Sequence, residues 1–270
     1  MKDNFDQPRK ESKLDEIFRA KAEELELLKK LVPLEELKRR VETTPRSIRD
    51  FLKALENNPN MSLIAEIKKA SPSLGDINLD VDIKEQAKKY ESAGANAISV
   101  LTDKRFKGEI GFLKEVSEVT TIPILRKDFI FDPYQIYESY LAGADSLLLI
   151  ATKLDEKTLN ELIDLTHELG MECLVEVHTK EDIEKIKKTK AKIIGINARD
   201  LRTFQVSLDN ITNVIGEVPK DRLIVAESGI ETSANVERLA KLGARVILVG
   251  TTLMTAKDVS AKVRELCIKI

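Results

Sequence analysis

The chain has 270 residues, a length that a single large α/β domain can reach, and 44 Lys and Arg oppose 46 Asp and Glu for a net charge of −2. This balance does not favour nucleic acid or an anionic membrane as a partner, so any recognition of a charged ligand has to be local. The sequence has only two cysteines, Cys173 and Cys267, and no signal-peptide core. Its apolar runs are much shorter than the roughly 20 residues of a membrane span. These features predict a cytoplasmic protein.

Residues 1–60 are expected to form a helical extension. After a polar tail, Leu14–Val41 has the pattern of a charged helical stretch with a break near Pro33. Pro45 stands where a first helical turn tolerates proline, and a second apolar series follows it at helical spacing, made of Ile48, Phe51, Leu52 and Leu55.

Residues 61–270 alternate short apolar runs with amphipathic segments. Eight such runs predict eight strands and therefore a single (β/α)8 barrel of the α/β class, a TIM barrel. The runs are apolar nearly throughout, as expected of parallel strands that are covered on both faces. The predicted strands are 63–67, 97–101, 122–126, 146–150, 173–177, 193–197, 223–227 and 246–250.

A short repeat supports this count of strands. Gly94, Gly143 and Gly243 each end a helical pattern and precede a predicted strand by two or three residues. Glycine at this position allows the left-handed turn that ends a helix.

Polar residues interrupt the C-terminal ends of the strands, where barrel enzymes carry their active sites. In the first strand the alternation places Ile64, Glu66 and Lys68 on one face. Barrels also bury ion pairs for packing alone, so a single such pair would not indicate a site. Further polar side chains at the same edge make an active site the better interpretation: Lys127, Glu176, Asn197, Arg199 and Glu227.

The loops after the last two strands resemble phosphate cradles, with Ser228-Gly229 in one and Gly250-Thr251 in the other. Backbone N–H groups, hydroxyls and a helix N-terminus bind phosphate at this place in many barrels.

Metals and nucleotide cofactors are not expected. His167 lies in a helical stretch, and His178 has the parity of Glu176 but no second His or Cys beside it. Cys173 is interpreted as a small apolar residue of the fifth strand. No glycine fingerprint of a nucleotide site occurs.

The segment 63–73, LIAEIKKASPS, followed by Gly75 and Ile77, resembles the signature of indole-3-glycerol-phosphate synthases. Five further segments resemble the family in the same order: IPILRKDFI, LVEVH, IGINARDL, VAESGI and LVGTTLM. The resemblance implies conversion of 1-(2-carboxyphenylamino)-1-deoxyribulose 5-phosphate to indole-3-glycerol phosphate, CO2 and water, within tryptophan biosynthesis. It implies no cofactor, no obligatory protein partner, and an N-terminal extension that packs over the barrel mouth.

The resemblance also implies roles for individual residues. Lys127 matches the general acid of ring closure, Lys68 a second essential lysine, and Glu176 the acid or base of dehydration, while the division of work between the lysines stays open. Glu66 and Glu227 are expected to hold the lysines and substrate hydroxyls. The remaining expectations are Asn197 and Arg199 at the anthranilate end, Ser228 near the sugar hydroxyls, Ser71, Gly229, Gly250 and Thr251 around the phosphate, and Phe106 and Phe129 against the aromatic ring, with Leu148 and Leu201 as further candidates.

Three alternatives remain at this stage. Another phosphate-binding barrel, such as a sugar-phosphate isomerase, would share the two cradles. That alternative would not explain the presence of Glu66, Lys68 and Ser71 together. A Schiff-base aldolase would want a lysine on a middle strand, where this chain has Asn197. A barrel kept only as a scaffold would have lost some of the polar side chains.

Overall fold

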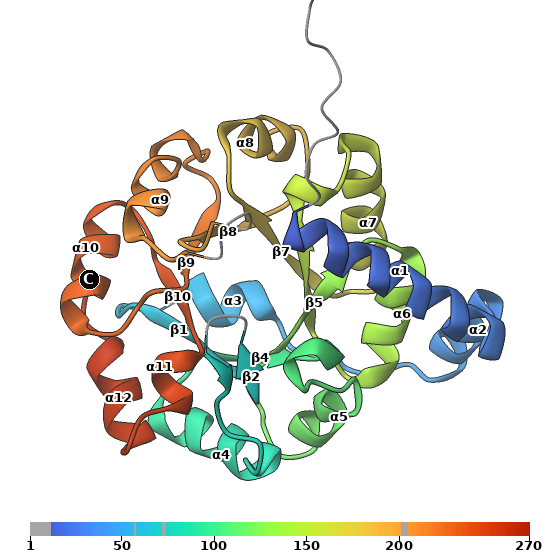
Figure 1. Cartoon of the computed structure of the whole chain (residues 1–270), viewed down its shortest axis with the longest axis horizontal. Coiled ribbons are helices and arrows are strands. Elements are labelled where there is room, and N and C mark those ends of the chain that lie inside the picture. Colours follow the sequence, from blue (N-terminus) through green and yellow to red (C-terminus); the bar gives the residue numbers. More distant parts are fainter. Residues whose placement is uncertain (1–11, 57, 72–73, 201–204) are drawn as a thin grey trace, which may run out of the picture.

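The computed structural model describes residues 12–56, 58–71, 74–200 and 205–270. Eight parallel strands close into a barrel in the order β1-β10-β9-β8-β7-β6-β5-β4 (Figure 1). The barrel predicted from the sequence is therefore confirmed. Its strands are β1 (Ser62–Ile67), β4 (Ala97–Leu101), β5 (Ile124–Ile130), β6 (Ser146–Ile150), β7 (Glu172–Val177), β8 (Ile193–Asn197), β9 (Leu223–Glu227) and β10 (Val246–Val249).

Helices surround the strands as an outer ring in Figure 1. The glycine repeat ends helices as predicted, because Gly94, Gly143 and Gly243 have φ of 105°, 98° and 108°. No helix of the described residues is long and apolar enough to cross a membrane. The helices after β1 are α4 (Ile83–Ala93), α5 (Gly111–Ser117), α6 (Pro133–Ala142), α7 (Glu156–Glu168), α8 (Lys180–Ile186), α9 (Leu208–Thr212), α10 (Ser233–Lys241), α11 (Thr251–Met254) and α12 (Val259–Leu266), with 3-10 turns η1 (Lys104–Phe106), η2 (Ala151–Lys153) and η3 (Ile215–Glu217) and a hairpin of β2 (Ala70–Ser71) and β3 (Gly75–Asp76).

The strands are buried on both faces. Along β1, Ile64 belongs to the cluster inside the barrel, whereas Leu63 and Ala65 belong to the layer between strands and helices. This division follows the alternation read from the sequence, and it explains why the strands are apolar nearly throughout. A charged side chain on the inner face, such as Glu66, is therefore an exception that calls for a partner.

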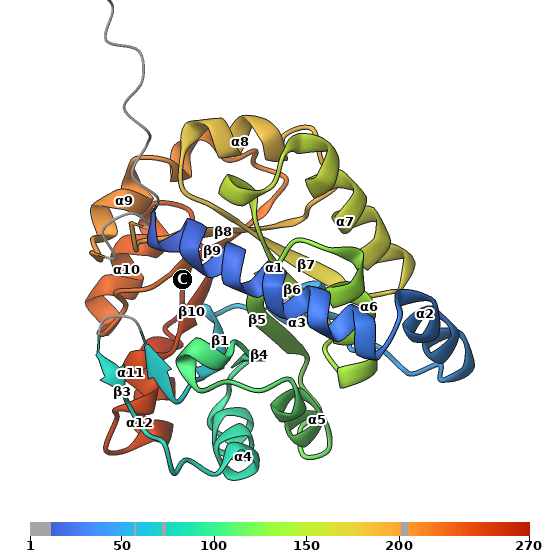
Figure 2. The same ribbon diagram turned by 45° about the vertical axis from the view of Figure 1, so that its right-hand side comes forward.

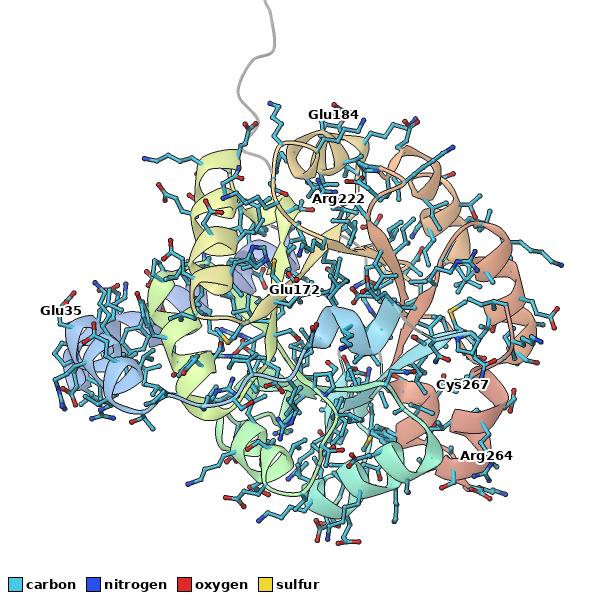
Figure 3. All side chains as sticks on the ribbon, turned by 180° about the vertical axis from the view of Figure 1, so that it is seen from behind. Glu35, Glu172, Glu184, Arg222, Arg264 and Cys267 are labelled. Carbon is cyan, nitrogen blue, oxygen red and sulfur yellow. The ribbon has the colours of Figure 1, made fainter. Side chains whose placement is uncertain are left out.

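The N-terminal extension contains three helices, α1 (Lys13–Leu31), α2 (Leu34–Thr43) and α3 (Phe51–Glu56). The break predicted near Pro33 is confirmed. Helix α1 lies across the barrel (Figure 2), and α3 lies near the centre of the view from behind (Figure 3). Phe51 and Leu55 of α3 pack against the side chains inside the barrel and close it at the N-terminal ends of its strands. The division into an extension of residues 1–60 and a barrel of residues 61–270 stays a prediction.

The helical turn predicted from Pro45 to Ile48 is wrong. Residues 45–50 have no helical structure, and α3 begins at Phe51. The Arg49 backbone N–H and guanidinium both donate to Asp145, at 3.0 Å each, and the Arg46 guanidinium donates to the same carboxylate at 3.2 Å. These contacts to the barrel compensate for the lost helical hydrogen bonds, so tertiary structure overrides the local pattern.

The third strand also differs from its predicted bounds of 122–126. It begins at Ile124, directly after Pro123, which has no N–H to donate to a neighbouring strand. It continues to Ile130, and its register against β6 shifts between Arg126 and Ile130. This irregularity surrounds Lys127, so the lysine lies within the strand rather than after it.

Candidate active site

A cavity opens at the C-terminal ends of the barrel strands. It holds about 1040 Å³ of empty space, part of it open to solvent, which is the size range of small-molecule sites. Fourteen residues that the sequence assigned to the site line it: Glu66, Lys68, Ser71, Phe106, Lys127, Phe129, Glu176, Asn197, Arg199, Glu227, Ser228, Gly229, Gly250 and Thr251. The structure thus brings the set together, while the role of each residue stays a prediction.

Two lysines meet three carboxylates in this cavity. Lys68 Nζ lies 2.8 Å from Glu66 Oε1. Lys127 Nζ lies 3.5 Å from Glu176 Oε2 and 3.6 Å from Glu227 Oε2. One ammonium therefore has a single close carboxylate, and the other lies between two.

Burial and charge separate the pKa values of Glu176 and Glu227. Burial raises the pKa of Glu227 to about 8, because Lys127 opposes this effect only in part and the neighbouring carboxylates of Glu176 and Glu66 add to it. Burial also acts to raise the pKa of Glu176, but Lys127, His178 and Asn197 lower it below its ordinary value. The site at neutral pH therefore contains an ionised Glu176 and a protonated Glu227.

Lys127 remains charged in this setting. Burial acts to lower its pKa, but the carboxylates of Glu176, Glu227 and Glu66 outweigh burial and raise the pKa above its ordinary value. The carboxylates prevail at Lys127, which is a proton donor throughout the neutral range.

Glu176 is fixed by two further side chains. Asn197 Nδ2 donates to Glu176 Oε2 at 3.1 Å, and His178 Nε2 lies 2.8 Å from Glu176 Oε1. The sequence placed His178 on the same face as Glu176 but gave it no role. Its position two residues after Glu176, directly after the end of β7, is the signal that could have identified it as a partner.

Two glycines make room for the charged groups. A Cβ on Gly195 in β8 would overlap with Glu227 Oε1. A Cβ on Gly250 would overlap with Glu66 Oε1 and would lie 2.8 Å from Lys68 Nζ. Gly250 was predicted as part of a phosphate cradle, and the structure adds this second reason for a missing side chain. Gly195 was not singled out from the sequence.

The two predicted cradles lie together on one side of the cavity. Ser228 and Gly229 have left-handed φ of 67° and 69°, which turns the chain sharply after β9. Gly250 and Thr251 follow β10 directly, and Ser71 lines the same cavity from β2.

Apolar side chains form another part of the wall. The rings of Phe106 and Phe129 lie 6.4 Å apart, and Leu148 lines the cavity near the inner core. Leu201 lies outside the described residues. Leu14 and Ile17 of α1 also line the cavity, so the extension contributes to the site. The sequence did not identify these two, because nothing local shows where α1 lies.

A buried ion network joins α1 to the strand that carries Lys127. Lys21 Nζ lies 3.0 Å from Asp103 Oδ2 and 2.8 Å from Asp128 Oδ1, and Arg126 Nη2 donates to Asp128 Oδ2 at 3.0 Å. Burial acts to lower the pKa of Lys21, but the two aspartates raise it overall. Asp128 directly follows Lys127, so this network holds the backbone beside the active-site lysine.

Comparison with known proteins gives a consistent result. The family model for indole-3-glycerol phosphate synthase matches residues 14–266. The chain is 44% identical over 257 residues to the indole-3-glycerol phosphate synthase of Desulforamulus reducens, covering 94% of this chain and 97% of that one. It is 46% identical over 217 residues to that of Acetivibrio thermocellus, covering 80% and 84%.

Among solved structures, 3-hexulose-6-phosphate synthase from Salmonella typhimurium matches 77% of this chain and 97% of its own, with a TM-score of 0.63 and 18% identity. That likeness concerns the barrel fold alone. The sequence relatives and the family model, which span nearly the whole chain, show that this protein belongs to the indole-3-glycerol phosphate synthase family.

Proposed function

We propose that this protein closes the indole ring of indole-3-glycerol phosphate from 1-(2-carboxyphenylamino)-1-deoxyribulose 5-phosphate. The observation that carries the proposal is the Lys127 ammonium between the buried carboxyl groups of Glu176 and Glu227, in a cavity with one apolar wall. This arrangement can both donate and accept a proton at one bound molecule. A cytoplasmic location and the lack of an obligatory protein partner stay predictions.

Lys127 acts in the first step. The aromatic carbon that bears the carboxylate attacks the ketone carbon, and the C=O electron pair moves to oxygen. The Lys127 ammonium donates a proton to that oxygen as the C–C bond forms. The C–COO⁻ bond then breaks and CO2 leaves. The electron pair of that bond stays with the ring and restores its aromaticity.

Glu176 and a lysine act in the second step. Ionised Glu176 removes a proton from the new ring, and the hydroxyl group leaves as water with a proton from an ammonium group. Lys68 or Lys127 can supply that proton. The second double bond of the five-membered ring forms at this point.

The remaining residues hold the substrate. The backbone and hydroxyl groups of Ser71, Gly229, Gly250 and Thr251 bind the phosphate, and Arg199 with Asn197 binds the anthranilate end. Protonated Glu227 donates to a substrate hydroxyl, and its Oε1 has no hydrogen-bond partner within the described part of the chain, which leaves it available as an acceptor. Phe106 and Phe129 pack against the aromatic ring.

The direct test uses purified protein, the carboxyphenylamino substrate and a chelator, with appearance of a fluorescent indole as the readout. No indole at high enzyme concentration would contradict the proposed activity.

Two variants separate the steps in a single-turnover reaction analysed by mass spectrometry. With Lys127→Ala, the reaction is expected to contain mainly unreacted substrate, because turnover is lowered by about 100-fold or more. Glu176→Gln is expected to release CO2 and accumulate an intermediate that has not lost water. Lys157→Ala, at an exposed lysine of α7, is the control and should behave as the unchanged protein.

A further inference from the structure

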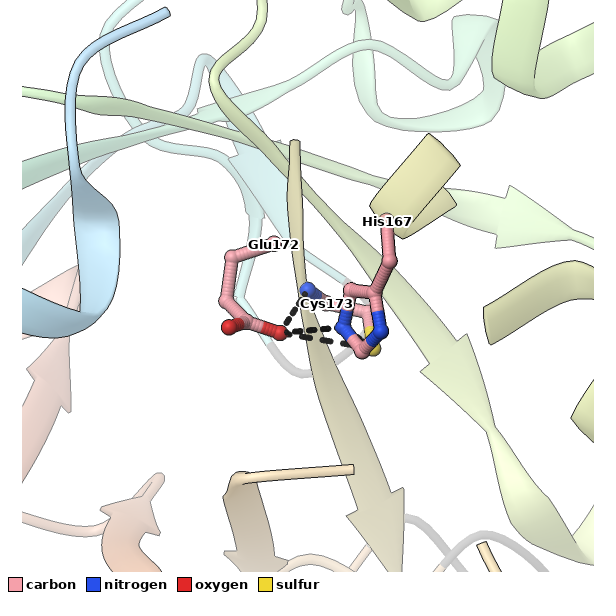
Figure 4. A group of neighbouring side chains, drawn as sticks. All are labelled: His167, Glu172 and Cys173. Atoms are coloured by element: carbon pink, nitrogen blue, oxygen red, sulfur yellow. Dashed lines mark hydrogen bonds and ion pairs between the residues drawn. The ribbon is translucent and has the colours of Figure 1, made fainter. Parts of the chain in front are cut away.

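Three metal-binding side chains meet at the end of the barrel opposite the active site. His167 lies near the end of α7, and Glu172 and Cys173 begin β7 after a short turn. Figure 4 shows the three side chains converging, and Figure 3 shows Glu172 in the view from behind. In the residues that the structure describes, this is the one group of three or more His, Cys, Asp or Glu side chains close enough to share a metal ion.

The distances between the donor atoms suit a metal ion. His167 Nε2 lies 2.8 Å from Glu172 Oε1, and Cys173 Sγ lies 4.0 Å from the first atom and 3.9 Å from the second. A point equidistant from three atoms so spaced is about 2.1 Å from each. Zinc binds imidazole nitrogen and carboxylate oxygen at roughly 2.0–2.2 Å and thiolate sulfur at roughly 2.3 Å. A tetrahedral ion lies out of that plane, so binding has to lengthen the His167–Glu172 separation by about 0.5 Å and shorten the two separations from sulfur by about 0.4 Å, movements that side-chain rotation can supply.

We propose that His167, Glu172 and Cys173 bind a thiophilic divalent cation of the Zn²⁺ class. A nitrogen, an oxygen and a sulfur donor are the ligands that zinc takes in proteins, whereas Mg²⁺ and Ca²⁺ take oxygen. A water molecule completes the tetrahedron on the exposed side, since the side chains of His167 and Glu172 are 26% and 14% exposed. Burial and then Glu172 hold the pKa of the Cys173 thiol well above its ordinary value, so the cation has to displace the thiol proton to solvent as it binds.

A hydrogen bond between His167 and Glu172 would by itself join α7 to β7. The Cys173 backbone N–H donates to the same Glu172 Oε1 at 3.0 Å, and this hydrogen bond holds the oxygen beside the Cys173 side chain. The simpler role explains the oxygen but does not require a thiol at this position. The thiol is fully buried, so the ion reaches it past His167 and Glu172. The sequence analysis interpreted Cys173 as a plain apolar residue and His167 as a helix residue, and it did not predict that they meet. The alternation of β7 places Glu172 and Cys173 on opposite faces, so the sequence pattern does not indicate their proximity.

The site is separate from the ring-closing site. Glu172 and Glu176 lie four residues apart on β7, or about 13 Å along the strand, at opposite ends of the barrel. The expected effect of the ion is therefore on stability, because it ties the end of α7 to the start of β7. The proposal does not depend on the activity proposed above.

Cobalt titration tests the proposal, since tetrahedral Co²⁺ with a thiolate ligand gives a charge-transfer band in the near ultraviolet and strong visible bands. The reduced, metal-free protein is expected to take up one Co²⁺ with both features, and Zn²⁺ should displace it and raise Tm. Cys173→Ser should lose the charge-transfer band. It should also weaken Co²⁺ affinity by more than the roughly 10–100-fold that is typical when a residue that only supports a metal ligand is removed. His167→Gln should weaken binding similarly.

Two controls locate the ion. Cys267→Ser removes the other thiol and His178→Gln removes the histidine beside Glu176, and both should keep the cobalt spectrum. Loss of the spectrum in either control, no thiolate band in the unchanged protein, or a zinc-dependent Tm rise that survives in Cys173→Ser would overturn the proposal. If Cys173→Ser does not fold, Cys173→Ala in the buried position gives the same comparison.

Discussion

At the scale of single residues, Glu176 and Glu227 show how one ammonium group can face two carboxyl groups in different states. Because the pKa of Glu227 is raised to about 8, this carboxyl group stays protonated below that pH and ionises above it. The pKa of Lys127 is also raised, so the lysine does not titrate in the same range. In the proposed complex protonated Glu227 donates a hydrogen bond to a substrate hydroxyl, and ionisation of Glu227 removes that donor.

We therefore expect kcat/KM to fall as the pH rises above about 8. Glu227→Gln keeps a neutral donor of similar shape, so the variant should have a lower rate at pH 7 but no such fall. Initial rates between pH 6 and 10 for both proteins give the comparison. The same alkaline fall in Glu227→Gln would show that another group titrates.

Gly195 and Gly250 control the positions of these charged groups. Gly250→Ala should displace the Glu66–Lys68 pair and lower kcat/KM about 100-fold, since a displacement near 1 Å can cost that much. Gly195→Ala should act similarly through Glu227. Gly216→Ala is the matched control, because a Cβ there has open space and Gly216 has no left-handed φ. Measurement of kcat/KM with Tm separates displacement from unfolding, and full activity of Gly250→Ala would contradict the argument.

At the scale of elements, α1 is attached to the barrel through ion pairs as well as apolar contacts. Lys21 is buried between Asp103 and Asp128, whereas Lys38 on α2 forms an exposed pair with Glu35. Removal of one partner from a buried network leaves an uncompensated charge, which costs much more than the loss of an exposed pair.

Lys21→Met is therefore expected to lower the free energy of unfolding by about 3–5 kcal/mol. It should also lower kcat, because Asp128 adjoins Lys127. Lys38→Met should change neither quantity measurably. Urea unfolding and steady-state kinetics on both variants provide the test, and equal effects of the two changes would refute the special position of Lys21.

The elements differ in how far the sequence predicts them. The strands and the three helix-ending glycines could be predicted, since apolar alternation and glycine conformation are local properties. The segment 45–50 could not, because its conformation depends on Asp145, about 100 residues later in the chain. For the same reason the placement of Leu14 and Ile17 in the cavity wall was not predictable from their own surroundings.

At the scale of the whole molecule, the polar set of the site was predictable because a parallel barrel brings all strand ends to one edge. Strand alternation then indicated which side chains point inward. Lys68 pairs with one carboxylate and Lys127 lies between two others. The distances in these pairs depend on side-chain packing and on the space that Gly195 and Gly250 leave. No pattern in the sequence specifies those distances.

Acid should destabilise the molecule partly through Asp128. Burial acts to raise the pKa of Asp128, but Arg126 and Lys21 lower it from 3.8 to about 2. The stabilisation is thus present above pH 4 and is lost as the pH falls towards 2. We expect Asp128→Asn to be less stable at pH 6 but to lose less stability, by about 2 kcal/mol, between pH 4 and 2. Unfolding free energies at pH 6, 4, 3 and 2 check this, and parallel curves would contradict it.

The path of the extension has a consequence for biosynthesis. Residues 12–56 leave the ribosome before residues 132–145, yet Arg46 contacts Asp145 at a separation of 99 residues, and Lys29 contacts Asp132 at a separation of 103. Helices α1 and α2 therefore lack part of their docking surface until residues 132–145 have been made. We therefore expect early strands to pair with one another before α1 and α2 complete their contacts with the barrel.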